Sequence, residues 1–239
     1  MASMPGASEK ASEDPTRPTH INVTASASSN ILHKHNNGTP FTVTLTAVLP
    51  IMPNEVSKPL TVFIHDTLLD PKGNVFFQGG LELVSSDSAE QTQAPESGPP
   101  QTSIYYSSKD LYTVDRENEQ YFVTLQPGVP YRVTHTMKVR QKFSMKSAYD
   151  KVSWVSQFGQ TQGINIGATY KVEFGESMSY IRWFRRGNKE EVLSGYEGFW
   201  GHLRRLTCLK RKPKDRIGDS DMRPIPLIQL NEVPVTVTF

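Results

Sequence analysis

The sequence predicts a mainly β protein, a two-sheet antiparallel sandwich with long loops and one short helix. Apolar and polar residues alternate along many short runs, as they do in strands that bury one face. The 16 Gly and 17 Pro are spread widely between these runs, which suits short strands and turns better than a helical bundle. Many short strand-like runs separated by turn signals are typical of two packed sheets.

The predicted strands follow one another between these turn signals. The clearest is residues 131–139, which alternates from end to end. An Asn-Asn-Gly turn at residues 36–38 separates the first two strands, because Asn and Gly tolerate positive φ. A short helix is expected within residues 144–163, where apolar side chains recur with helical spacing. The expected strands are residues 20–25, 41–49, 60–64, 81–84, 103–106, 121–125, 131–139, 168–174, 180–184, 191–193 and 233–239.

One domain is expected over residues 20–239. Residues 1–19 are small, polar and Pro-containing, so they predict a disordered tail that cannot bury enough apolar surface to offset its ordering entropy. Residues 85–101 are rich in Ser, Gln, Glu and Pro, and predict a flexible loop inside the domain. A basic loop is expected at residues 204–216, between the last two strands.

Charge is unevenly distributed along the chain, although its net value is only +2. Residues 1–120 hold 7 Lys and Arg against 14 Asp and Glu, whereas residues 121–239 hold 19 against 10. The basic loop carries a net charge of +6 in thirteen residues. Such a segment is either a solvated loop attracted to the acidic half, or a site for a polyanion or for nuclear import. The candidate polyanion-binding residues are Arg204, Arg205, Lys210, Arg211 and Lys212.

The sequence predicts a cytoplasmic protein without membrane contact, with nuclear localisation as an alternative. The first 18 residues are polar and lack the apolar run of a signal peptide. No apolar run is long enough to span a bilayer. The lone Cys208 cannot form an internal disulfide. Glycosylation in a secreted protein stays open as an alternative, because Asn22 and Asn37 begin Asn-x-Thr triplets.

Motifs for catalysis or cofactor binding are absent from the sequence. There is no Gly-x-Ser-x-Gly nucleophile elbow and no glycine-rich phosphate loop ending in Lys-Ser or Lys-Thr. Six scattered His and one Cys offer no closed set of metal ligands. We therefore assign no catalytic residue and expect no cofactor and no metal, which argues against an enzyme without excluding one.

Two groups of side chains are candidates for ligand binding. His65 beside Asp66 provides an imidazole oriented by a carboxylate, as general base catalysis requires. The alternative is a strand end that leads into an Asx-type turn at Asp70. Trp183 and Trp200 belong to an aromatic cluster, with Tyr180 among its members, that is interleaved with arginines. Such clusters stack on bases, carbohydrates or planar metabolites, but they also form cores with a charged outer face.

Residues 60–84, which contain Leu-Thr-Val-Phe-Ile-His-Asp-Thr-Leu-Leu-Asp-Pro and Gly-Gly-Leu-Glu-Leu, resemble a segment of uncharacterised intracellular fungal proteins. More distantly, the strand, Leu-x-Pro-Gly turn and strand arrangement is similar to the N-terminal pro-domain of deuterolysin-type metalloproteases. The resemblance implies an immunoglobulin-like fold. It transfers no catalytic residue, because the His-Glu-x-x-His zinc helix of those proteases has no counterpart here. The resemblance to the fungal proteins continues at residues 125–128, 167–172, 183, 189–193 and 235–237.

Three functions remain in competition. The leading hypothesis is a non-catalytic binding or interaction module for an unknown protein or small-molecule ligand. The first alternative is a cyclase or isomerase of fungal specialised metabolism that acts in an apolar pocket without a sequence motif. The second is a polyanion binder that uses the basic loop, with nucleic acid as its partner. A closed pocket containing His65 or His135 would favour the enzyme, whereas a filled core and a flat surface would favour the module.

Overall fold

The computed structural model confirms a mainly β fold. It describes residues 18–33, 40–51, 58–76, 78–86, 114, 116–137, 143–144, 155–156, 165–197, 217 and 223–238. Residues 1–17 of the expected tail at 1–19 are outside this described part of the chain. Residues 87–101 of the expected loop at 85–101 are outside it as well. The expected strand at 103–106 and the basic loop at 204–216 are also outside them. None of the helices in the described part of the chain is long and apolar enough to cross a membrane.

The largest sheet has five strands, and alternate residues of its long strands are buried. Along β3, every second residue from Phe41 to Ala47 is buried, because successive side chains of a strand point to opposite faces. The strand β1 follows the same pattern, so its Thr24 faces outward while its neighbours are buried. The order across the sheet is β11 (Tyr180–Ile181), β13 (Ile225–Gln229), β1 (Ile21–Ala27), β3 (Phe41–Val48) and β7 (Tyr131–Met137).

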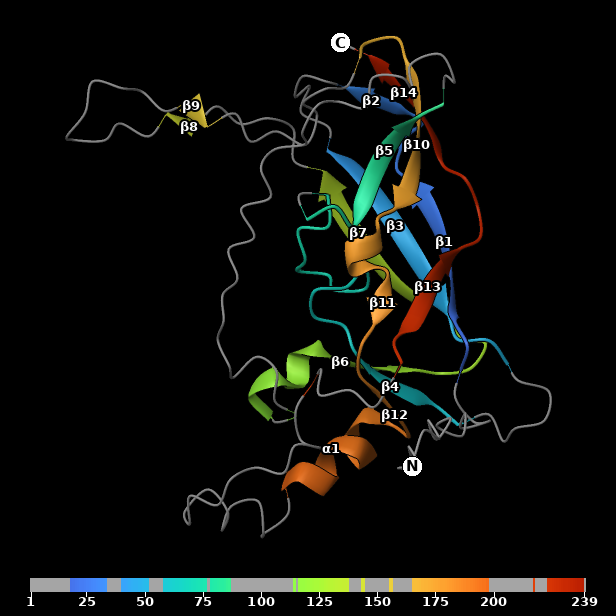
Figure 1. The fold of residues 1–239 in the computed structure, drawn as a ribbon, viewed down its shortest axis with the longest axis vertical. Helices are drawn as coiled ribbons and strands as arrows, with labels where there is room; N and C mark the ends of the chain where they lie inside the picture. The colour runs from blue at the N-terminus through green and yellow to red at the C-terminus, as the bar shows by residue number, and fades with distance from the viewer. Residues whose placement is uncertain are drawn as a thin grey trace, which may run out of the picture.

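The second sheet has four strands and shares a core with the first. Val43 of the five-stranded sheet and Val172 and Val235 of the four-stranded sheet belong to one cluster of buried apolar side chains. The two sheets therefore bury their apolar faces together, and β5 and β10 lie in front of β3 and β7 in Figure 1. The order across this sheet is β2 (Ile31–His33), β14 (Pro234–Thr238), β10 (Thr169–Phe174) and β5 (Leu81–Ser85).

A third sheet lies at the opposite end of the molecule from β2 and β14 (Figure 1). Its order is β12 (Phe184–Arg186), β4 (Leu60–Phe63) and β6 (Phe122–Leu125), and the helix α1 (Lys189–Glu197) lies beside it. Two 3₁₀ helices, η2 (Arg116–Tyr121) and η3 (Glu176–Met178), precede β6 and β11. A second apolar cluster forms at this end from Phe63, Val114, Phe122, Trp183, Leu193 and Ile217.

Two local predictions were wrong. The expected strand at 180–184 is split, because Ile181 packs into the first core while Trp183 packs into the second. The expected strand at 191–193 is part of α1, where Glu190 and Glu191 occupy the first turn and are favoured by the positive end of the helix dipole. Most of residues 144–163 lies outside the described residues, so the short helix expected there stays a prediction. Ser144 and residues 155–156 belong to the two-stranded sheet of β8 (Phe143–Ser144) and β9 (Val155–Ser156).

The prediction of an antiparallel sandwich was only partly correct. Two strand pairs are parallel, β1 with β13 and β2 with β14. In the second pair, β2 follows β1 with only residues 28–30 between them. The segment thus passes from the five-stranded to the four-stranded sheet, where β2 pairs with the C-terminal strand β14. The short strand β2 and the Pro-containing strand β13 were not anticipated.

Candidate functional site

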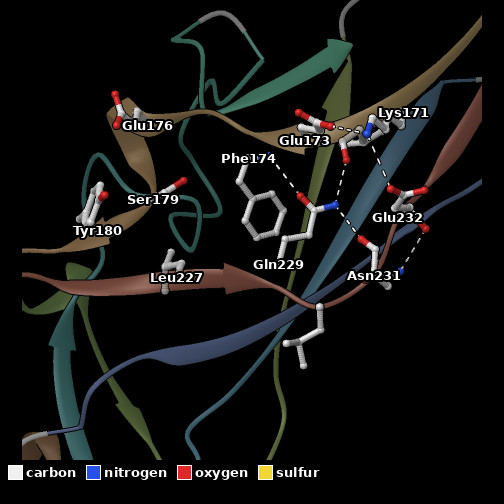
Figure 2. Close-up of a pocket in the computed structure, with 12 residues that line it drawn as sticks. Lys171, Glu173, Phe174, Glu176, Ser179, Tyr180, Leu227, Gln229, Asn231 and Glu232 are labelled. Carbon is white, nitrogen blue, oxygen red and sulfur yellow. Dashed lines mark hydrogen bonds and ion pairs between the residues drawn. The ribbon is translucent and has the colours of Figure 1, made fainter. Parts of the chain in front are cut away.

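Two hollows, both open to solvent, lie on either side of the η3–β11 segment. The first has a volume of about 510 Å³ and lies between β10 and the end of β13 (Figure 2). The second has a volume of about 500 Å³. Glu176 and Tyr180 line both, so the two hollows are neighbours, and we refer to the pair as the groove. The remaining lining of the second hollow is Gly79, Glu82, Ser177 and Arg182, and that of the first is Lys171, Val172, Glu173, Phe174, Ser179, Leu227, Gln229, Leu230, Asn231 and Glu232.

The groove lies where the chain passes from one sheet to the other. The strand β10 belongs to the four-stranded sheet, and η3 carries the chain across to β11 at the edge of the five-stranded sheet. Gly175 makes this crossing close, because its N–H donates a 2.9 Å hydrogen bond to the Gly80 carbonyl. A Cβ atom at position 175 would collide with the backbone carbonyl of Gly79. Glycine is therefore required at position 175 to hold η3 against residues 79–80.

Gln229 connects the two sheets at the floor of the first hollow (Figure 2). Its side-chain oxygen accepts a 3.2 Å hydrogen bond from the N–H of Phe174, and its Nε2 donates to the carbonyl of Val172 at 2.9 Å. These backbone groups belong to β10, past the residues at which β10 pairs with β14. The same Nε2 also donates to the carbonyl of Asn231 at 2.7 Å. The amide of Gln229 thus takes the place of a strand along β10.

The side-chain amide of Asn231 takes the place of a strand along β1. Its side-chain Oδ1 accepts a hydrogen bond from the N–H of Ala25, and its Nδ2 donates to the carbonyl of Ala25, both at 2.8 Å. The pairing of β1 with β13 ends at Val23 and Gln229, so this amide extends the ladder beyond the end of β13. Ser179 is also engaged, because its Oγ donates to the carbonyl of Gly175 at 2.6 Å. The polar side chains of Gln229, Asn231 and Ser179 are therefore structural.

The charged side chains at the rim of the first hollow form a small network. Lys171 Nζ lies 2.9 Å from a carboxylate oxygen of Glu173 and 3.6 Å from one of Glu232. The hydrogen bond and charge of Glu173, followed by the charge of Glu232, raise the pKa of Lys171. Glu82 and Glu176 have no ion-pair or hydrogen-bond partner in the part of the chain that the structure describes. Both line the second hollow together with Arg182, so the whole lining carries four carboxylates against two cations.

The groove also exposes apolar surface. Tyr180 is 40% exposed, and Leu230 is 57% exposed. Both line the first hollow, where the partly buried Phe174 also lies. The combination of exposed apolar side chains with charged groups around them is typical of a surface that contacts a partner.

The sequence-predicted pair of His65 and Asp66 lies beside the groove. His65 Nδ1 is 3.0 Å from Asp66 Oδ2, and the ring meets that of Tyr121 edge-on with the centroids 4.4 Å apart. The hydrogen bond to Asp66 raises the pKa of His65 against the opposing effect of burial. The same bond lowers the pKa of Asp66, and the nearby charge of Arg182 lowers it further. Arg182 lines the second hollow, so this pair borders the groove without forming its wall.

The backbone holds the pair in this position. Asp66 has a φ of 56°, in the left-handed region that aspartate tolerates better than most residues. The turn is closed by the N–H and the Oγ1 of Thr67, which donate to the carbonyl of Ile64 at 3.1 and 2.7 Å. The expected Asx-type turn also forms, because Asp70 Oδ1 accepts a 2.9 Å hydrogen bond from the N–H of Lys72. The two interpretations of this segment are therefore compatible.

Trp183 lies in the second apolar cluster and is only 3% exposed. Its ring contacts that of Phe122 edge-on, and the guanidinium of Arg185 lies 5.5 Å from its centroid. The Nε1–H of Trp183 is buried and has no hydrogen-bond acceptor among the described residues. Trp183 thus packs as a core residue, away from both hollows, and its role as a ligand contact stays a prediction. Trp200, Arg204, Arg205, Lys210, Arg211 and Lys212 lie outside the described residues.

His135 is buried and lines neither of the two hollows. It is 3% exposed, and its Nε2 lies 2.8 Å from the carbonyl of Leu68, to which it donates. Burial lowers the pKa of His135, whereas the Leu68 hydrogen bond and the charge of the buried Asp70 raise it. Burial and the charge of Asp70 raise the pKa of Tyr131. No group of three or more metal-binding side chains comes together in the described segments.

No protein-family model, curated protein or solved structure matches this chain. The resemblance to fungal proteins and to protease pro-domains therefore stays a prediction. The function has to be argued from the groove and from the residues around it. Sequence reasoning singled out His65, Asp66 and Tyr180 in this region, but it missed Gln229 and Asn231, because amide side chains that replace a strand leave no pattern in the sequence.

Proposed function

We propose that the protein is a non-catalytic binding module, built on an immunoglobulin-like sandwich, that binds its partner in the groove around η3 and β11. The observation that carries this proposal is that polar side chains of the groove are already hydrogen-bonded to the backbone. Gln229, Asn231 and Ser179 have their hydrogen bonds taken up by the backbone. They brace a fixed surface and do not form an acid and base pair poised for reaction.

The strand order supports the immunoglobulin-like part of the proposal. In the constant-type immunoglobulin fold, strands A, B and E are neighbours in one sheet, and strands C, F and G are neighbours in the other. Here β1, β3 and β7 are neighbours in the five-stranded sheet, and β5, β10 and β14 are neighbours in the four-stranded sheet. Chain order matches the letters A, B, C, E, F and G. On this assignment, β4, β6, β11, β12, β13 and α1 are insertions between the sandwich strands.

The two histidines that could support an enzyme favour the binding module instead. His135 is enclosed by the packed core and holds the Leu68 carbonyl. His65 is oriented by Asp66, which is a requirement for a general base, but it lines neither hollow. The groove is open to solvent and lacks the enclosed apolar walls that a motif-less cyclase or isomerase needs. A cytoplasmic location fits the lone Cys208 and is part of this proposal.

The proposal can be tested with a library of random peptides displayed on phage. Peptides selected on the wild-type protein are then measured against the double variant Tyr180→Ala/Leu230→Ser and against Ile31→Ser. Ile31 is a matched control, because it is also 40% exposed and lies on β2, outside the groove. We expect selected peptides to bind the control normally and the double variant at least tenfold more weakly. Equal binding to all three proteins, or no selected peptide, would overturn the proposal.

A further inference from the structure

The charge of the groove identifies the class of partner, and this inference rests on the proposed function. The lining of the groove holds four carboxylates, Glu82, Glu173, Glu176 and Glu232, against two cations, Lys171 and Arg182. Lys171 pairs with Glu173 and Glu232. Glu82 and Glu176 have no ion-pair partner in the described part of the molecule. A partner that approaches the groove therefore meets net negative charge, which favours positive charge on the partner.

The aromatic ring in the groove adds a second preference. Tyr180 lines both hollows together with Glu176, and it is 40% exposed. Lysine and arginine side chains cover aromatic rings with their aliphatic stems and are attracted to the ring face. A cationic side chain that lies along Tyr180 can thus reach toward carboxylates of the groove. The exposed Leu230 offers an apolar contact in the first hollow, which an aliphatic side chain would cover.

The shape of the groove favours an extended segment over a compact ligand. The hollows have similar volumes of about 510 and 500 Å³, and only the η3–β11 segment separates them. An extended chain presents side chains in alternation, so it can place one in each hollow. We infer that the groove binds an extended peptide segment of a partner protein that alternates basic and aliphatic side chains.

The test uses four labelled nine-residue peptides. In three of them Leu alternates with Lys, with Ser or with Glu, and in the fourth Lys alternates with Ser. Fluorescence anisotropy gives the affinity of each peptide for the full chain. We expect the Leu/Lys peptide to bind best, because it matches both the charge and the apolar surface. A Leu/Ser peptide that binds equally well would overturn the inference on charge while leaving the proposed function intact. A Lys/Ser peptide that binds as tightly as the Leu/Lys peptide would overturn the inference that aliphatic side chains contribute to binding.

A matched pair of protein variants ties the charge effect to the groove. In Glu82→Gln/Glu176→Gln, the two carboxylates that have no ion-pair partner become neutral amides of the same size. Glu190→Gln is the control, because Glu190 is exposed on α1, outside the groove. Affinity for the Leu/Lys peptide should fall about fivefold or more in the double variant, as expected for loss of surface charge pairs, and should not change in the control. Equal affinity for both variants would refute this inference, provided that circular dichroism shows both to be folded.

Discussion

Gln229 of the five-stranded sheet donates a 2.9 Å hydrogen bond from its side chain to the carbonyl of Val172 in the four-stranded sheet. One amide thereby joins the two sheets at the floor of the groove. Neither β13 nor β14 pairs with β10 at this point through its backbone. Without Gln229, the N–H of Phe174 and the carbonyl of Val172 would have to find water in a partly buried place. The rigidity of the groove therefore depends on a side chain.

The first prediction concerns the stability that Gln229 provides. Replacing Gln229 by Ala removes three hydrogen bonds, so we expect the free energy of unfolding to fall by about 2–3 kcal/mol. Chemical denaturation measures this change. The control is Gln126→Ala, which removes a single exposed hydrogen bond to Asn188 and should cost less than about 0.5 kcal/mol. Similar losses in both variants would show that the Gln229 amide does not brace the two sheets.

The second prediction concerns the pair of His65 and Asp66. The pKa of His65 is raised above its ordinary value of 6.5, so its contribution to stability is complete below that value and is lost as the pH rises through the raised pKa. Asp66→Asn removes the contribution and keeps a residue that tolerates the left-handed conformation. Because the Asp66 side chain is 56% exposed, the effect should stay below about 1 kcal/mol.

Urea denaturation of the wild-type protein and of Asp66→Asn at about pH 5.5 and about pH 9 measures this effect. The wild type should be the more stable of the two at the lower pH, and the difference should shrink at the higher pH. Other titrating groups are common to both proteins, so they cancel in the comparison. A difference that is independent of pH would mean that His65 does not become charged beside Asp66.

The sandwich strands could be predicted from the sequence because each has one buried face. In β7, buried Val133, His135 and Met137 alternate with exposed residues, and the same period of two is visible in the sequence. Prediction failed where one segment serves two cores. Ile181 and Trp183 have the same period of two as a single strand, but they belong to different clusters. The period alone does not show that the chain bends between them.

Other failures had local causes. Val192 and Leu193 were assigned to a strand, although Asn188 precedes Glu190 and Glu191 in the order that begins a helix. The carbonyl of Asn188 accepts a hydrogen bond from the N–H of Val192, the first of α1. The groove could not be predicted at all. Its walls come from three segments that are distant in sequence and meet only through the pairing of β10, β11 and β13 with other strands.

The third prediction concerns the buried His135. Its pKa is lowered chiefly by burial, so the folded protein resists protonation while the unfolded chain takes up a proton below about pH 6.5. Stability should therefore fall as the pH drops from 6.5 toward the lowered pKa. His135→Gln can still donate a hydrogen bond to the Leu68 carbonyl, but it does not titrate. Denaturation at about pH 7.5 and about pH 5.5 should show a smaller loss for this variant. An identical loss in both proteins would assign the acid sensitivity to other groups.

The fourth prediction comes from the alternative of polyanion binding through residues 204–216, which lie outside the described residues. On this alternative, the affinity for a labelled DNA duplex of about 20 base pairs should fall with salt by about 0.9 log units per log unit for each phosphate contacted. A variant with Lys210, Arg211 and Lys212 replaced by Ala should bind more weakly and with a shallower slope. Anisotropy titrations at several salt concentrations measure both. Equal binding by the two proteins, or none at low salt, would leave the segment as a solvated loop.

The last prediction concerns the unpartnered Nε1–H of Trp183, which is buried without an acceptor among the described residues. An unsatisfied buried donor costs about 1–3 kcal/mol of stability. Removing this donor therefore offsets part of the stability that is lost when a smaller ring packs less well. Trp183→Phe should therefore change the free energy of unfolding by less than about 1 kcal/mol.

The alanine variant separates packing from hydrogen bonding at the same position. Trp183→Ala empties the space between Phe122 and Arg185 and should cost about 3–5 kcal/mol, as other large truncations in cores do. Chemical denaturation of both variants gives the comparison, and Phe keeps an aromatic face for the guanidinium of Arg185. If Trp183→Phe were as destabilising as Trp183→Ala, the indole N–H would have to bind an acceptor in the folded protein. In that case Trp183 would be a polar anchor and not only a packing residue.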